Sequence, residues 1–318
     1  MQASALFDLT GRVALVTGGG TGIGLMIAQG LAANGAKVYI TGRREHVLTK
    51  SAQTSEGKGQ LVPLTMDVTD KASILSAKEM VFSNDGFLDI LVNNAGQDDP
   101  GSVWMSDESD VKNKEPEAFG LGLFDERQED WSNIFSIIGY SCFFVTSAFL
   151  GLLAKGSERH GAYSANVINV TSVCASIEVA MNHFGYNSAK AAATHITKMF
   201  ATELARRKIP VRVNTLAPGL FESEMTAEKL AENGIEGVTL GVQPLPHARV
   251  GGANEMAGTA LWMASLAGGY LNGQEIMIDG GYTAVNPSRS RLYGPRENAV
   301  PCHSPWRLEI YLYVDSFS

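Results

Sequence analysis

Residues 17–24 read TGGGTGIG, a glycine-rich string that lies between two segments of different character. The apolar run Val13–Val16 precedes it and is typical of a strand, whereas Ile23–Leu31 follows it and is amphipathic like a helix. Glycines let the backbone turn tightly and approach a ligand closely, and the next helix presents free N–H groups at its start. Because the string lies between strand and helix near the start of the chain, we interpret it as a cradle for a dinucleotide pyrophosphate.

Short β-prone runs alternate with helical stretches along most of the chain, and several of these runs are almost continuously apolar. Parallel strands covered on both faces have this composition. We therefore expect a single-domain Rossmann-type α/β fold over residues 1–286, a doubly wound parallel sheet of about seven strands with helices on both faces. The expected strands are Val13–Thr17, Lys37–Thr41, Leu61–Met66, Ile90–Asn93, Asn166–Thr171, Val211–Leu216 and Glu275–Ile278. The expected helices are Ile23–Asn34, Lys71–Asn84, Trp131–Leu153, Ser188–Arg207 and Ala253–Ser265.

The composition excludes several classes of partner. The chain has 318 residues and a net charge of −8 without clustered Lys and Arg, so we expect neither nucleic acid nor a membrane as a partner. Cys142, Cys174 and Cys302 lack the spacing of metal ligands, and free thiols predict a reducing, cytoplasmic location. The N-terminus lacks the pattern of a signal peptide, and the apolar stretch 142–154 is too short to span a bilayer, so we expect a buried helix there.

Two segments interrupt the repeating pattern. Residues 97–130 are long, acidic and irregular, and we expect a surface excursion near the carboxyl edge of the sheet. It either borders the ligand site or is a solvated loop without a role. Residues 287–318 begin Arg-rich and end in a β-prone run, and we treat them as a C-terminal extension of unknown order.

Further polar strings follow the expected strands. Tyr186 and Lys190 form a Tyr-x-x-x-Lys string, and Ser172 stands fourteen positions before the tyrosine, at the end of a strand. The string Asn-Asn-Ala-Gly follows another strand at 93–96, and Pro-Gly follows a third at 218–219. Ligands of a doubly wound sheet bind at the carboxyl ends of its strands, so these strings are expected to meet at one site.

Taken together, these strings resemble the short-chain dehydrogenase/reductase superfamily over roughly residues 6–285. The stretches beginning LFDLTGRVALVTGGG and IDGGYTAVNP are most similar to the branch that contains the 3-oxoacyl-(acyl-carrier-protein) reductases of the rhamnolipid-biosynthesis type. The resemblance implies catalytic roles for Ser172, Tyr186 and Lys190. It also implies that the substrate wall contains Met181, Phe184, Phe221 and Met225.

The proposed chemistry follows from the ionisation of a phenol. A free tyrosine titrates near pH 10, too high for efficient acid–base work at neutral pH. An ammonium one helical turn away favours the phenolate, so Lys190 would lower the pKa of Tyr186 and let it act as the proton donor in reduction. Ser172 would donate a hydrogen bond to the substrate oxygen. The resemblance adds that Lys190 would hold the nicotinamide ribose.

The turn after the second strand bears on cofactor choice. Arg43 and Arg44 stand there without a carboxylate, which favours a ribose 2′-phosphate, so we expect NADP(H) rather than NAD(H). Thr21 stands where many NADP-dependent relatives have a basic residue. The candidate cofactor-binding residues are Gly18, Thr21, Gly22, Ile23, Gly24, Arg43, Arg44, Asp67, Val68, Asn93, Ala95, Gly96, Tyr186, Lys190, Pro218, Gly219 and Ser223.

One position departs from the family pattern. Ile138 stands seven residues after Trp131, where the family usually has an asparagine that supports a proton relay to the lysine. Ser141, one helical turn on, is a candidate substitute. The departure motivates an alternative function as a catalytically weak NADP-binding sensor or scaffold.

The leading hypothesis is an NADPH-dependent oxidoreductase that interconverts a ketone and a secondary alcohol. The branch resemblance implies a 3-oxoacyl thioester, and a secondary-metabolite ketone is the next candidate substrate. It also implies a homotetramer or homodimer built through the two long helices, Trp131–Leu153 and Ser188–Arg207. No metal is expected.

Overall fold

The protein is represented by a computed structural model that describes residues 2–55, 57–97, 101–161, 163–223, 226, 230–231, 234–235 and 244–286. The chain separates into a compact unit, residues 1–288, and the remaining residues 289–318. The predicted extension, residues 287–318, lies outside the described residues.

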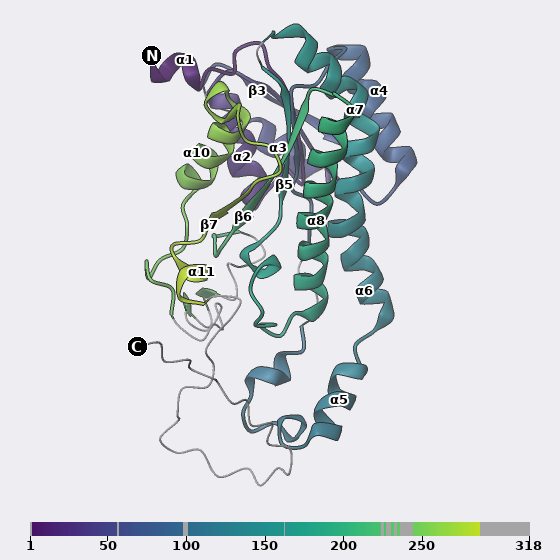
Figure 1. The fold of residues 1–318 in the computed structure, drawn as a ribbon, viewed down its shortest axis with the longest axis vertical. Helices are drawn as coiled ribbons and strands as arrows, with labels where there is room; N and C mark the ends of the chain where they lie inside the picture. Colours follow the sequence, from purple (N-terminus) through teal and green to yellow (C-terminus); the bar gives the residue numbers. More distant parts are fainter. Residues whose placement is uncertain are drawn as a thin grey trace, which may run out of the picture. The chain divides into compact units, whose positions relative to one another are not determined.

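Seven parallel strands form one sheet in the order β3-β2-β1-β4-β5-β6-β7, which confirms the predicted fold class (Figure 1). The strands are β1 Val13–Thr17, β2 Lys37–Gly42, β3 Gln60–Thr65, β4 Ile90–Asn93, β5 Ala165–Val170, β6 Val211–Pro218 and β7 Glu275–Ile278. The order of connection reverses between β1 and β4, and such a switch point opens a crevice at the carboxyl ends of the strands.

Helices cover both faces of the sheet because alternate strand residues point to opposite sides. Ala14 and Val16 of β1 belong to an apolar cluster with α2 and α10, whereas Val13 and Leu15 belong to a second cluster with α4, α7 and α8. Figure 1 shows the two groups on either side of the strands. The larger helices are α2 Gly22–Ala33, α3 Glu45–Ala52, α4 Lys71–Asn84, α7 Ser141–Arg159, α8 Phe184–Arg206 and α10 Ala253–Ala264. Short helices are α1 Ala3–Leu6, η4 Val173–Ala175, η5 Leu266–Gly268 and α11 Tyr282–Val285.

The first long helix begins earlier and ends later than predicted. It comprises α6 Gln128–Ile134, the π-helical segment η3 Phe135–Tyr140 and α7. At 32 residues the whole helix, which contains the predicted apolar stretch 142–154, is long and apolar enough to cross a membrane. However, 56% of its most apolar window is buried inside the protein, as in a core helix.

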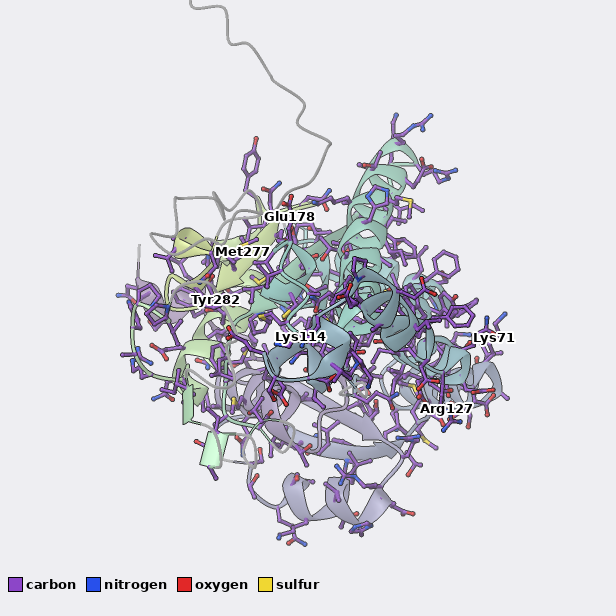
Figure 2. The ribbon with its side chains drawn as sticks, turned by 90° about the horizontal axis from the view of Figure 1, so that it is seen from below. Lys71, Lys114, Arg127, Glu178, Met277 and Tyr282 are labelled. Atoms are coloured by element: carbon purple, nitrogen blue, oxygen red, sulfur yellow. The ribbon has the colours of Figure 1, made fainter. Side chains whose placement is uncertain are left out.

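The acidic excursion has more regular structure than its sequence predicts. Within residues 101–130 the chain forms η1 Val103–Ser106, η2 Val111–Asn113, α5 Pro116–Phe124 and the start of α6. Figure 1 shows α5 at the end of the sheet where α8 begins. Figure 2 views the protein from this end and labels Lys114 and Arg127 of the excursion, together with Glu178 and Tyr282 from other segments there.

Candidate active site

A cavity of about 400 Å³ opens at the carboxyl ends of the strands, where the sequence predicts the ligand site. Both the glycine-rich turn and the predicted catalytic residues line this cavity. The predicted residues that line it are Gly18, Thr21, Gly22, Ile23, Gly24, Arg43, Arg44, Asp67, Val68, Ala95, Gly96, Ser172, Tyr186, Lys190, Pro218, Gly219 and Ser223.

The glycine-rich turn requires its glycines for two physical reasons. Gly18 and Gly22 adopt φ angles of +62° and +51°, a region that other residues enter at a cost. A Cβ on Gly24 would lie 2.3 Å from the carbonyl oxygen of Gly18, so no side chain fits there. The helix α2 begins at Gly22 and leaves its first N–H groups without intrahelical partners, as a phosphate cradle requires.

Asn94 holds this turn in place, although the sequence prediction did not include it. Its side-chain amide donates hydrogen bonds to the carbonyl oxygens of Thr17 at 3.0 Å and Gly18 at 3.2 Å. The Thr17 hydroxyl accepts from the backbone N–H groups of Asn94 and Ala95, both at 2.9 Å. The strand end β4 and the turn after β1 are thereby bonded directly to each other.

Asn93, by contrast, is not among the residues that line the cavity, and its predicted place along the cofactor stays a prediction. It is buried as the last residue of β4, and its amide donates to the Thr146 hydroxyl at 3.0 Å and to Asn169 Oδ1 at 2.8 Å. Successive residues of a strand point to opposite faces, and at this strand end the first asparagine points into the packed interior.

Arg43, the residue predicted to favour NADP(H), lines the cavity and interacts electrostatically with the carboxylate of Asp67. Burial alone would raise the pKa of Asp67, but hydrogen bonds from the N–H and hydroxyl of Thr69, together with the charge of Arg43, hold it below its usual value. Asp67 is therefore ionised at neutral pH and bonded to its own turn. Arg43 and Arg44 both border the same cavity, where their charge would favour an anionic group.

The three predicted catalytic residues line the same cavity. The Lys190 ammonium nitrogen lies 5.5 Å from the centre of the Tyr186 ring, one helical turn apart on α8. Burial lowers the pKa of Lys190 to about 8, while Cys174 and Cys142 act in the opposite direction. Ser172 ends the loop after β5, and its hydroxyl accepts a hydrogen bond from Cys174 N at 3.2 Å. A buried cation, a phenol and a hydroxyl therefore face one cavity.

Ile138 lies close to this group, in the π-helical segment η3. It is buried and packs with Ile134, Cys142 and Ala189. Ser141, the candidate substitute for the missing asparagine, donates its hydroxyl hydrogen to the carbonyl oxygen of Ile137 at 2.7 Å, within its own helix. In this structure Ser141 thus bonds to its helix backbone rather than to Lys190.

Several cavity residues were missed by the sequence prediction. Most of them are apolar or backbone-lining residues at the ends of strands and carry little signal of their own. Gly20 and Asn94 stand within recognised strings but were not predicted as site residues. The missed residues are Gly20, Thr41, Gly42, Val47, Leu48, Met66, Asn94, Gln97, Ile137, Val170, Thr171 and Thr226. Of the expected substrate wall, Phe221 lines the cavity, Met181 and Phe184 do not line it, and Met225 lies outside the described residues.

The residues present fit a dinucleotide better than a metal. The start of α2 and the space at Gly24, which a Cβ would fill, match a pyrophosphate. The two arginines in the cavity wall match a phosphorylated ribose. Among the residues that the structure describes, no group of three or more His, Cys, Asp or Glu side chains could hold a metal ion.

Comparisons with known proteins agree with this site. A family model described as Enoyl-(Acyl carrier protein) reductase matches residues 18–283. The chain is 38% identical over 290 residues to the short-chain dehydrogenase/reductase PhomF of Diaporthe leptostromiformis, with 90% of this chain and 96% of PhomF covered. It is 32% identical over 276 residues to the rhamnolipids biosynthesis 3-oxoacyl-[acyl-carrier-protein] reductase of Pseudomonas aeruginosa, with 87% of this chain and 98% of that protein covered.

A solved structure resembles the whole arrangement. The Pseudomonas aeruginosa RhlG/NADP active-site complex superposes with a TM-score of 0.75 at 31% identity, covering 89% of this chain and 99% of RhlG. The family model spans most of the chain, and the relatives match it over nearly their full length. On this evidence, the chain belongs to the short-chain dehydrogenase/reductase family.

Proposed function

We propose that this protein is an NADP(H)-dependent oxidoreductase that interconverts a ketone and a secondary alcohol. The observation that carries the proposal is the meeting of Tyr186, Lys190 and Ser172 in the cavity that also contains the glycine-rich turn. That arrangement supports an acid–base role for Tyr186, with Lys190 as the cation that tunes it and Ser172 as a hydrogen-bond donor, next to the turn that would hold a dinucleotide.

Each residue then has a definite task. The Tyr186 phenol gives its proton to the carbonyl oxygen during reduction and removes it during oxidation. The Lys190 ammonium favours the phenolate, and the Ser172 hydroxyl donates to the oxygen on which negative charge develops. When bound, the nicotinamide supplies or accepts the hydride. Gly18, Gly22 and Gly24 would hold the pyrophosphate, because they have no side chains that would occupy the space beside the turn.

The preference for NADP(H) rests on Arg43 and Arg44. A guanidinium offers a planar set of donors that matches the geometry of a phosphate, and both side chains border the cavity near Asp67 and Val68. The NADP complex of RhlG supports the same preference. Cys142 and Cys174 are present as thiols rather than in a disulfide, which supports a reducing, cytoplasmic location.

For the substrate we propose a 3-oxoacyl thioester first and a secondary-metabolite ketone second. The 3-oxoacyl-[acyl-carrier-protein] reductase relative supports the first choice. The alternative, a catalytically weak NADP-binding sensor or scaffold, is not favoured, since the relatives are dehydrogenases and reductases.

The decisive experiment follows the absorbance of NADPH at 340 nm with 3-oxoacyl thioesters, bulkier ketones and, because of the family model's description, enoyl thioesters. We expect NADPH oxidation with ketones, little with NADH, and a loss of about 100-fold or more in Tyr186→Phe with NADPH binding retained. Ketone turnover that survives in Tyr186→Phe would contradict the assigned acid. Reduction of enoyl thioesters alone would contradict the reaction.

The assembly we propose is a homotetramer or homodimer formed through α7 and α8. These helices and the adjoining η3 leave Tyr140, Phe143 and Met199 exposed at 53%, 45% and 48%. Exposed large apolar side chains on adjoining helices support a subunit contact there. Size measurement by light scattering on the full chain and on a chain that ends at residue 287 tests the assembly and any role of the extension.

A further inference from the structure

The turn that leads into the α8 helix has a strained backbone. Met181 and Asn182 adopt φ angles of +50° and +66°, a region in which asparagine is tolerated better than methionine. Two residues later α8 begins at Phe184, and Tyr186 lies in its first turn. The position of this turn therefore sets where the Tyr186 ring stands, and such strain persists only where surrounding contacts hold it.

The acidic excursion supplies those contacts on one side. The N–H of Ser102 donates to the carbonyl oxygen of Asn182 at 2.8 Å, and the Asn182 side-chain amide donates to the Ser106 hydroxyl at 2.6 Å. Asn182 is 8% exposed and is therefore a buried partner in both bonds, whereas Ser106 is exposed. A Cβ on Gly101 would lie 2.5 Å from the His183 ring, so the excursion backbone packs directly against the turn.

The excursion is itself anchored to the long helix. The Ser102 hydroxyl donates to Glu126 Oε1 at 2.5 Å, and the Trp131 ring nitrogen donates to Glu126 Oε2 at 2.8 Å. The carboxylate of Glu126 thus joins the beginning of the excursion to α6. Because α6 continues into η3, which contributes Ile137 to the cavity, the support is continuous with the wall of the site.

Two other elements hold the same turn from its remaining sides. The Asn187 side chain donates to the carbonyl oxygens of Val179 at 3.3 Å and Ala180 at 3.0 Å. The Tyr282 hydroxyl, from α11, donates to the Met181 sulfur at 3.2 Å. With α8 and α11 on two sides, the excursion completes the support through Asn182.

We propose that Asn182 is a positioning residue for Tyr186, and that residues 101–126 of the excursion hold it through Ser102 and Ser106. The hydrogen bonds that Asn182 accepts from Ser102 and donates to Ser106 keep the left-handed turn in one conformation, and that conformation fixes the first turn of α8. The inference rests on the proposed function, because its effect on rate is read through proton transfer by Tyr186.

The test compares Asn182→Gly, which keeps the backbone conformation but removes the amide, with Ser106→Ala, which removes only its partner. We expect kcat to fall roughly tenfold in each, with KM and the NADPH dissociation constant within about twofold of wild type. The double variant should be no slower than the slower single one, since both changes remove the same bond. Ser106→Thr, which keeps the hydroxyl, should restore the rate.

The matched control is Ser109→Ala, since Ser109 lies in the same excursion and bonds only to Asp107 in the structure. A second readout does not require turnover: amide hydrogen exchange of residues 179–187 should accelerate in Ser106→Ala and stay unchanged in Ser109→Ala. In the active enzyme, the pH profile of alcohol oxidation should also move to higher pH, because a displaced phenol is farther from Lys190.

The possible outcomes separate the two proposals. Wild-type protein that reduces no ketone while Ser106→Ala still loosens residues 179–187 contradicts the proposed function but keeps the structural support. An active wild type whose Ser106→Ala and Asn182→Gly variants match it in kcat, pH profile and exchange overturns the positioning role.

Discussion

The ammonium of Lys190 donates a hydrogen bond to the carbonyl oxygen of Val170 at 3.0 Å. This bond joins α8, which carries Tyr186, to the last residue of β5, which leads directly to Ser172. This strand–helix pair therefore contributes to the relative positions of the cation, the phenol and the hydroxyl. The bond to Val170 also explains how Lys190, which is 5% exposed, is tolerated in the interior.

Burial of Lys190 should cost the protein stability at neutral pH. Its pKa of about 8 in the folded state lies below the ordinary value of 10.5, so between these values the unfolded chain binds more protons. Stability should therefore rise as pH increases from about 8 to 10.5, and the penalty should be complete below pH 8. We expect Lys190→Met to abolish turnover yet raise the free energy of unfolding at pH 7 by about 1–3 kcal/mol.

Urea unfolding at pH 7 and pH 10 measures this effect, and Lys198→Met provides the control. Lys198 lies on the same helix, but 52% of its side chain is exposed. A Lys190→Met protein that is less stable than wild type at pH 7 would show that the hydrogen bond to Val170 outweighs the loss of hydration.

The two adjacent asparagines of the Asn-Asn-Ala-Gly string should separate cofactor binding from stability. Asn94→Ala removes the bonds that hold the glycine-rich turn, so we expect the NADPH dissociation constant to rise about tenfold. Asn93→Ala removes buried bonds to α7 and β5, so we expect a loss of about 1–3 kcal/mol in unfolding free energy with the NADPH affinity of the folded protein retained. Fluorescence titration with NADPH and thermal unfolding measure the two effects, and the reverse pattern would refute the assignment.

Arg43 should discriminate between the two nicotinamide cofactors. In Arg43→Ala we expect the NADPH dissociation constant to rise roughly 10- to 100-fold, because a charge-assisted bond to phosphate is lost. The affinity for NADH, which lacks that phosphate, serves as the internal control and should change less than about twofold. Equal losses for both cofactors would instead indicate that Arg43 shapes the turn between β2 and α3.

Ile138 allows a test of whether the missing asparagine limits the enzyme. Because Ile138 is buried among apolar side chains, Ile138→Asn should lower the free energy of unfolding by about 1–3 kcal/mol. Turnover should stay within about threefold of wild type, since Lys190 is already bonded to Val170.

The conservative variant Ile138→Val controls for packing and should cost only about 0.5–1.5 kcal/mol. Stopped assays of ketone reduction alongside urea unfolding make the comparison. A tenfold or greater gain in turnover for Ile138→Asn would mean that the proton relay is impaired in the natural sequence.

The local residue pattern predicted those strands and helices that depend on residues close together in the sequence. β1, Val13–Thr17, and α4, Lys71–Asn84, have the bounds predicted from the sequence. An apolar run, a glycine turn and an amphipathic repeat each express their preference within a few residues. The same locality allowed Tyr186 and Lys190 to be paired, because residues four apart on a helix share a face.

Only the tertiary structure decided which residues of a recognised string face the site and which lie behind it. It turned Asn93 into the sheet and Asn94 toward the glycine turn, and it buried Lys190 beneath a carbonyl from another element. It also brought the acidic excursion against Asn182, some 76 residues away along the chain. These hydrogen bonds and buried contacts join segments that are distant in the sequence. They therefore produce no periodic residue pattern from which they could be predicted.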